Sequence, residues 1–320
     1  MGIIDWPQPR PGDPGRSLDL LLETGLKRVG LSVNDFELIG RSRGRCAYRA
    51  PALNLFAHTD VAGRERIAKH EVRFARWAAE RSLPTLNTDA RFPDQPVLTP
   101  HGSLTLWRLG DPVDQVEPDY EWLGRALCQL HDVDATSAPS SWEPLQWLAD
   151  GLDLLRGEPT LNRDLLGAFQ SEIACISLWL EGPGSRLPTA AIHGDASFGN
   201  VVSVDGHMVL TDFETSGVGP VGYDLSAVRV LAKRFELPRE YADRLTAAIA
   251  IAIDDAAQAM LDRLYELVGI AAVIAPHVRT AGFLGELETR VGSLDDETVR
   301  WTPHRRLMDR GSLEEGADLI

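Results

Sequence analysis

The stretch of sequence that decides the fold is AIHGDASFGNVVSVDGHMVLTDFE, residues 191–214. Two short apolar runs within it, Val201–Val204 and Met208–Thr211, are separated by an Asp-Gly pair. Apolar runs joined by Asp-Gly are typical of a β-hairpin with a type I′ turn. Because a hairpin returns the chain to its starting point, Asn200 before it and Asp212 after it should lie close together.

A third polar residue, Asp195, precedes Asn200 by five positions in the same loop. The pattern therefore brings two carboxylates and one amide oxygen to one end of the hairpin. A few oxygen ligands, with water and phosphate completing the shell, suit Mg²⁺. A further carboxylate could orient a hydroxyl and accept its proton. Each residue alone has an ordinary explanation in a turn or a cap, and it is their joint spacing that indicates chemistry.

The sequence around this segment divides into three parts. Residues 1–16 are rich in proline and glycine, which predicts a flexible N-terminal arm. Residues 17–108 contain short strand-like runs and an amphipathic helix over Glu65–Arg81, which predicts a small lobe with an antiparallel sheet. Residues 109–320 are dominated by helical periodicity, which predicts a larger helical lobe.

The order His193-Gly194-Asp195, then Asn200, then Thr211-Asp212-Phe213-Glu214 resembles the motifs of the aminoglycoside phosphotransferase family in the protein-kinase-like superfamily. The resemblance extends over roughly residues 30–300. It implies an α+β, protein-kinase-like bilobal fold. The small N-lobe, with an antiparallel sheet plus a helix, would bind nucleotide. The larger, mostly helical C-lobe would hold the catalytic loop and the acceptor site.

The resemblance also implies a role for each matching residue. Asp195 would be the catalytic base that orients the acceptor hydroxyl, and Asn200 and Asp212 would bind Mg²⁺. Glu71 would be the glutamate of the N-lobe helix. A glycine turn that contains Gly40 and Gly44 would lie over the nucleotide phosphates. The hinge against which the purine lies would contain Trp107 and Leu109.

One feature of kinase-like folds is missing. Their third strand carries a lysine that holds the α- and β-phosphates and pairs with the helix glutamate, but the predicted strand Ala52–His58 has neither Lys nor Arg. By spacing, Asn54 takes the lysine's position. Arg49 or Lys69 could supply the charge from another direction, a shifted register could make Arg49 the true counterpart, or the protein could be a weak or inactive kinase. We favour compensation, because the magnesium motif is complete.

Composition excludes several protein classes. The 320-residue chain is 44% hydrophobic and 25% charged, which is ordinary for a folded protein. Its longest apolar stretches are about nine residues, too short to span a membrane, and no signal peptide is visible. Three scattered cysteines (Cys46, Cys128 and Cys175) argue against a disulfide framework and predict a cytoplasmic location.

Charge is unevenly distributed along the chain. The total is -15, which argues against nucleic-acid binding. Residues 1–110 carry 16 basic and 12 acidic side chains, whereas residues 111–320 have a net charge of -19. The first part could therefore receive an anion and the second a cation, although an acidic solvated surface explains the second part equally well. Acidic side chains that could meet an acceptor, or merely be solvated, are Glu286, Glu288, Asp295 and Asp296.

Together these features predict a Mg²⁺-dependent phosphotransferase that moves the γ-phosphoryl group of ATP or GTP to a hydroxyl. The acceptor would be small and cationic: an aminoglycoside, a basic antibiotic or an amino alcohol. Expected partners are this nucleotide and this acceptor, with no nucleic acid and no membrane. A nucleotide-binding pseudokinase is the main alternative, because of the missing lysine. A metal-dependent phosphoesterase would need more carboxylate or histidine ligands than this segment provides.

Overall fold

The computed structural model describes residues 14–42, 44–115, 117–140, 142–249, 251, 253–278, 281–303, 306 and 307. The chain forms two compact units, which are Met1–Trp142 with Ala190–Gly219, and Glu143–Thr189 with Pro220–Ile320. The first unit thus contains the segment that decides the fold. The predicted arm, residues 1–16, lies outside the described residues except for its last three, which begin helix α1 (Pro14–Arg28).

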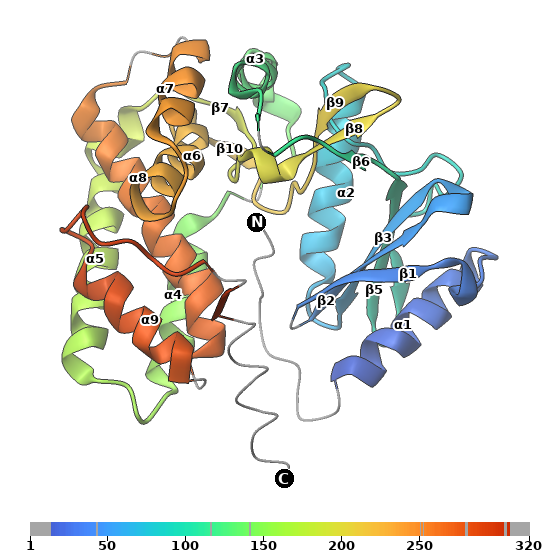
Figure 1. The fold of residues 1–320 in the computed structure, drawn as a ribbon, viewed down its shortest axis with the longest axis horizontal. Coiled ribbons are helices and arrows are strands. Elements are labelled where there is room, and N and C mark those ends of the chain that lie inside the picture. Colours follow the sequence, from blue (N-terminus) through green and yellow to red (C-terminus); the bar gives the residue numbers. More distant parts are fainter. Residues whose placement is uncertain are drawn as a thin grey trace. The chain divides into compact units, whose positions relative to one another are not determined.

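The first unit is built on a five-stranded antiparallel sheet in the order β1-β2-β3-β5-β4. Its strands are β1 (Glu37–Ser42), β2 (Arg45–Ala50), β3 (Leu55–Val61), β4 (Val97–Thr99) and β5 (Gly102–Arg108). Helix α1 and helix α2 (Glu65–Ala79) lie on opposite faces of this sheet (Figure 1). The predicted N-terminal sheet and its helix are therefore present.

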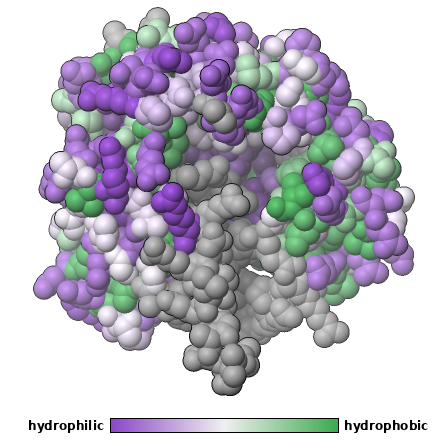
Figure 2. All heavy atoms as spheres, in the orientation of Figure 1, coloured by the Kyte–Doolittle hydropathy of each residue, from purple (hydrophilic) through white to green (hydrophobic). Residues whose placement is uncertain are grey.

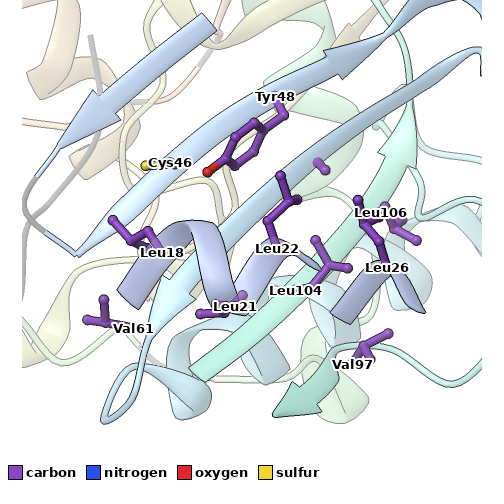
Figure 3. Close-up of a cluster of buried hydrophobic side chains, with 11 residues drawn as sticks. Leu18, Leu21, Leu22, Leu26, Cys46, Tyr48, Val61, Val97, Leu104 and Leu106 are labelled. Carbon is purple, nitrogen blue, oxygen red and sulfur yellow. The ribbon is translucent and has the colours of Figure 1, made fainter. Parts of the chain in front are cut away.

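A hydrophobic core lies between α1 and one face of the sheet (Figure 3). The helix contributes four leucines at helical spacing, and the strands contribute alternate residues such as Ala57 and Val61 of β3. Each leucine buried in this way contributes about 1.5–3 kcal/mol. Since side chains alternate along a strand, the intervening residues of β3 (Phe56, His58 and Asp60) lie on the face opposite α1.

The strand predicted over Ala52–His58 is wrong by three residues, because β3 spans Leu55–Val61. Pro51–Leu53 instead forms a single 3₁₀ turn, and Asn54 follows it with a left-handed backbone (φ 55°). Proline lacks the N–H that a strand ladder needs and suits the first position of a helical turn. Asparagine tolerates the left-handed region better than most residues. These local preferences delay the start of the strand.

The fold-deciding segment forms the predicted hairpin. Strands β8 (Val201–Val204) and β9 (His207–Leu210) pair antiparallel, and β6 (Asp111–Pro112) joins β8 on its other side. Asp205 and Gly206 both have positive φ, at 53° and 78°, as a type I′ turn requires. In the same unit, β7 (Thr189–Ile192) pairs with β10 (Gly217–Pro220), and helix α3 is Tyr120–His131.

The second unit is helical in its described residues. Its helices are α4 (Pro144–Arg156), α5 (Arg163–Glu181), α6 (Tyr223–Arg234), α7 (Arg239–Ala248), α8 (Asp255–Gly269) and α9 (Ala281–Gly292), with a π-helix at Ile270–Ile274. A fully buried ion pair of Arg234 with Glu266 joins α6 to α8.

Hydrophilic residues predominate on the face drawn in Figure 2. Among the described helices, none is long and apolar enough to cross a bilayer.

Candidate active site

The loop after β7 carries Asp195, and its shape depends on Gly194. Gly194 has φ 83°, and a Cβ placed on it would lie 2.3 Å from the carbonyl oxygen of Thr215. Glycine is therefore required at position 194 for two reasons: the backbone is left-handed, and the backbone of Thr215 leaves no room for a Cβ. This close approach brings the Asp195 loop against the segment that follows Asp212.

Asp195 and Asn200 are joined directly. The Asn200 side-chain amide donates to the Asp195 carbonyl oxygen at 2.8 Å and to its carboxylate Oδ2 at 3.0 Å. Since the amide nitrogen is used in this way, the amide oxygen of Asn200 is directed elsewhere and can serve as a ligand. The Thr211 N–H donates to the Asn200 carbonyl oxygen at 2.9 Å, which closes the base of the hairpin. The hairpin thus brings the two ends of the motif together, as predicted.

His193 is a buried member of the same loop with a defined tautomer. Its Nε2 lies 2.9 Å from the Thr211 carbonyl oxygen, which can only accept, so Nε2 carries the hydrogen. Its Nδ1 is then an acceptor for the Asp195 N–H, at 3.4 Å. The ring also packs on Phe213. His193 therefore supports the loop on which Asp195 is presented.

Asp212 is held in an unusual environment for a carboxylate. Its backbone is left-handed (φ 65°), and its Oδ1 is buried without a hydrogen-bond partner among the described residues. Burial raises the pKa of Asp212 well above its usual value, and the nearby carboxylates of Glu214, Glu71 and Asp195 raise it further, while Arg45 acts in the opposite sense. A half-buried carboxylate with a buried, unpartnered oxygen, lying near other carboxylates, is where a cation would be favourable.

The residues present fit a magnesium ion. Asp212 offers a carboxylate oxygen without a partner and Asn200 offers an amide oxygen, which are the hard ligands that Mg²⁺ prefers. Within the described ranges, no group of three or more His, Cys, Asp or Glu side chains is placed to hold a metal ion. At nucleotide-dependent sites, Mg²⁺ commonly has one or two protein ligands, and water and phosphate fill its other positions.

A buried ion cluster lies beside this carboxylate. The Arg45 guanidinium, at the start of β2, donates to both oxygens of Asp60 on β3 at 2.8 and 3.2 Å and to Glu71 of α2 at 3.3 Å. Its third nitrogen lies 3.3 Å from Glu214, two residues after Asp212. Arg64, at the start of α2, pairs with Asp60 and Glu214 as well. All five of these side chains are at most 5% exposed.

The cation that pairs with Glu71 is therefore Arg45. The residues predicted from the sequence for this position are Asn54, Arg49 and Lys69, and none of them takes it. Arg49 is half-exposed and pairs with Glu37 across β1 and β2. Lys69 is exposed on α2. Asn54 lies outside β3, so the strand position inferred for it is wrong.

Two residues on the sheet were missed by the sequence reasoning. Arg45 directly follows Gly44 of the predicted glycine turn, but it lies in β2, where it pairs with Asp60 in the sheet register. His58 lies on the same face of β3 as Asp60, and burial, with Arg45 and Arg64 nearby, lowers its pKa to about 3. The clue was Asp60 itself, a buried carboxylate near the end of β3 that needs a cation.

The predicted phosphate-covering turn is shorter than expected. Gly40 lies inside β1, opposite Ala47 at a bulge, and Gly44 lies in the turn that leads into β2. Strand β1 thus extends through Ser42, where the sequence predicted a turn from Gly40 onward.

The predicted hinge residues lie at the end of β5 and beyond it. Trp107 is buried, and its indole N–H donates to Thr105 at 3.0 Å. The Leu109 N–H donates to the carbonyl oxygen of Asn54 at 3.1 Å. Next to it, a Cβ on Gly110 would lie 2.5 Å from Val202, so this segment lies directly against β8. The hinge role of these residues stays a prediction.

We expect Gly194→Ala to lower the free energy of unfolding by about 2–4 kcal/mol, because it combines a left-handed strain with a steric clash. Gly206→Ala is the matched control, since Gly206 has a similar φ but no atom within 4 Å of its Cβ position. Urea unfolding of both variants separates the two effects. Equal losses in the two variants would contradict a contribution from the clash with Thr215.

His70 links α2 to the chain after the motif. Its Nε2 lies 3.1 Å from the hydroxyl of Ser216, which itself donates to the Phe213 carbonyl oxygen at 2.6 Å. Since the hydroxyl hydrogen is already used, His70 is the donor. Burial lowers the pKa of His70 to about 4, with the charge of Arg73 acting in the same direction. The imidazole is therefore neutral throughout the physiological pH range.

This depressed pKa predicts a specific acid response. Between pH 6.5 and 4 the unfolded chain binds a proton at His70 and the native protein does not, so stability is lost as pH falls. His70→Gln keeps a donor for Ser216 but does not titrate. Between pH 7 and 5 we expect the wild type to lose on the order of 2 kcal/mol relative to this variant in urea unfolding. A pH-independent difference would contradict the assignment.

Comparison with known proteins places this geometry in a family. Residues 60–267, more than half of the chain, match the model of the phosphotransferase enzyme family. A search of curated proteins found no significant match.

Solved structures share the fold. An aminoglycoside phosphotransferase from Streptomyces rimosus is 18% identical with a TM-score of 0.59, covering 78% of this chain and 99% of its own. A choline/ethanolamine kinase family protein from Mesorhizobium loti is 18% identical with a TM-score of 0.59, covering 87% and 92%. A choline kinase from Streptococcus pneumoniae is 12% identical with a TM-score of 0.62, covering 84% and 95%.

The solved structures confirm the predicted α+β, kinase-like fold. The family match confirms the prediction that the protein is a phosphotransferase enzyme. The matched segment includes α2, the Asp195 loop and the hairpin that ends at Asp212. The chain therefore belongs to the phosphotransferase enzyme family.

Proposed function

We propose that this phosphotransferase moves the γ-phosphoryl group of ATP or GTP to a hydroxyl of a small cationic acceptor, in a Mg²⁺-dependent reaction. Asp195 would orient the acceptor hydroxyl and accept its proton, and Asn200 and Asp212 would hold the metal. The observation that carries the proposal is the convergence of these three oxygen-bearing side chains at the base of one hairpin, with a direct bond between Asp195 and Asn200.

The geometry favours positioning as the main contribution of the protein. Asn200 fixes one oxygen of the Asp195 carboxylate, and His193 fixes the backbone of Asp195, so the carboxylate has a defined direction. A bound Mg²⁺ would supply positive charge to the phosphates as negative charge develops on them. In phosphoryl transfer most of the catalysis comes from such orientation and charge stabilisation.

Two observations support a cationic acceptor. Residues 111–320 carry a net charge of -19, and an electrostatic field of this sign attracts cations. Among the structural neighbours, one aminoglycoside phosphotransferase was solved with ADP and streptomycin, another with ADP and hygromycin B, and a third neighbour is a choline kinase. We therefore propose that the acceptor is an aminoglycoside, a basic antibiotic or an amino alcohol.

The acidic residues singled out from the sequence are largely engaged within the second unit. Glu286 is buried and pairs with Arg290, and Asp295 pairs with Arg263. Asp296 accepts from the N–H and the hydroxyl of Thr298, which lowers the pKa of its carboxyl. These carboxylates have structural partners, so the proposal for the acceptor depends on the overall charge.

A panel of amine-bearing and sugar acceptors, incubated with ATP or GTP and Mg²⁺, tests the proposal by mass spectrometry of the product. A mass increase of one phosphoryl group that requires both metal and Asp195 is the expected result. No transfer to any acceptor, together with no effect of Asp195→Ala on nucleotide hydrolysis, would overturn it. Binding of Mg-ATP without transfer would instead favour the nucleotide-binding alternative.

A further inference from the structure

Arg45 is the one described side chain that joins β2, β3, α2 and the loop after Asp212 by ion pairs. All three of its guanidinium nitrogens lie within 3.3 Å of carboxylate oxygens, which belong to Asp60, Glu71 and Glu214. It is fully buried. A fully buried arginine with this many carboxylate contacts is held in a single orientation, because its planar fork fits carboxylates at fixed angles.

The contact with Glu214 bears on the metal site. Glu214 is two residues after Asp212, and the intervening Phe213 packs on Phe74 of α2, with ring centroids 5.5 Å apart. The short segment is therefore held from two sides, by an ion pair and by an aromatic contact. With Glu214 fixed, the left-handed backbone of Asp212 is fixed as well, and its Oδ1 keeps the buried position described above.

We propose that Arg45 is a positioning residue that performs from β2 part of the work a β3 lysine performs in kinase-like folds. It holds Glu71 of α2, and through Glu214 it sets the position of the proposed metal ligand Asp212. Because Arg45 is fully buried and each of its three nitrogens lies beside a carboxylate, this role does not include a contact with the nucleotide phosphates. The inference rests on the proposed function, because it assigns Asp212 to the metal.

Lysine cannot replace this arginine. A lysine ammonium is a point charge on a flexible stem and cannot keep three carboxylates of separate elements in place at once. Arg45→Lys therefore keeps the charge of the cluster but loses the link between Glu71 and Glu214. The substitution separates charge from geometry, which makes it the informative variant.

The experiment measures Mn²⁺ binding in the presence of ADP, by the loss of the free-Mn²⁺ signal in electron paramagnetic resonance, together with the Tm. Arg45→Lys is expected to weaken Mn²⁺ binding at least about 10-fold at a temperature where the variant is folded. Arg234→Lys is the matched control, since Arg234 is equally buried and ion-paired but lies in the second unit. It is expected to lower the Tm and to leave Mn²⁺ binding unchanged.

A second variant covers the case in which Arg45→Lys does not fold. Asp60→Asn loosens the Arg45 fork from β3 without changing a residue of the metal loop, and it is expected to weaken Mn²⁺ binding as well. Binding within twofold of the wild type, in whichever variant folds, would overturn the inference and leave the proposed function intact. Failure of the wild-type protein to bind Mn²⁺ with ADP would instead overturn the proposed function.

Discussion

Asp195→Asn is expected to lower the rate of phosphoryl transfer by about 10³-fold, within the range that a general base contributes. Asparagine keeps the size of the side chain and can still accept from the Asn200 amide, so the loop should remain in place. What is lost is the carboxylate that accepts the proton of the acceptor hydroxyl. Nucleotide affinity should change little, because the proposed nucleotide and metal contacts are made by other residues.

Asp205→Asn is the matched control for this substitution. Asp205 lies only ten residues away in the exposed hairpin turn, where it pairs with Arg108 at the surface. Asparagine also suits the left-handed backbone of the turn (φ 53°). Steady-state kinetics and isothermal titration with ADP measure the two effects. A transfer rate in Asp195→Asn within tenfold of the wild type would contradict the role of Asp195 as the base.

Asp212→Asn is expected to reduce Mg²⁺-dependent transfer by about 10³-fold and, at the same time, to stabilise the metal-free protein. The Oδ1 atom of its carboxylate is buried without a partner among the described residues and lies near other carboxylates. A neutral amide avoids this cost. Because asparagine also tolerates a φ of 65°, the substitution adds little backbone strain.

The stabilisation by Asp212→Asn should depend on pH in a defined sense. The pKa of Asp212 is raised in the native protein, so above its unfolded value the native state binds more protons than the unfolded chain. The wild type therefore gains stability as pH falls, and the variant does not. We expect an advantage for the variant on the order of 1–2 kcal/mol at pH 8 that shrinks toward pH 4.

Urea unfolding in the presence of EDTA measures this advantage across the pH range. Excess Mg²⁺ and ADP should reverse the order of stability, since only the wild type gains from binding. A variant that is less stable than the wild type at pH 8 without metal would contradict the picture of Asp212 as a strained, unpartnered carboxylate. Loss of activity together with a gain in stability is common at functional sites.

The hairpin and its polar residues were predictable because every signal is local. Asp-Gly between two apolar runs specifies the turn, and the turn brings Asn200 beside the start of Asp212's segment. Gly194 is likewise recognisable as a special backbone position. The motif from His193 to Glu214 occupies 22 consecutive residues, so the backbone geometry of a single supersecondary unit is enough to place its members.

The N-terminal sheet was predicted less well. Its strands were found, but β3 begins three residues later than its sequence suggested, since Pro51 and Asn54 prefer a turn. The predicted strand also ended at His58, so Asp60 was left outside it, and the search for a cation turned to Arg49 and Lys69.

The amino-acid sequence alone determined the fold class and the carboxylate–amide–carboxylate arrangement, because these depend on periodicity and on turns within short segments. Only the tertiary structure decided which cation meets Glu71. Arg45, Asp60, Glu71 and Glu214 come from four separate elements, and their meeting depends on strand register and on the packing of α2. These are set by the free energy of the whole fold, so no local pattern encodes them.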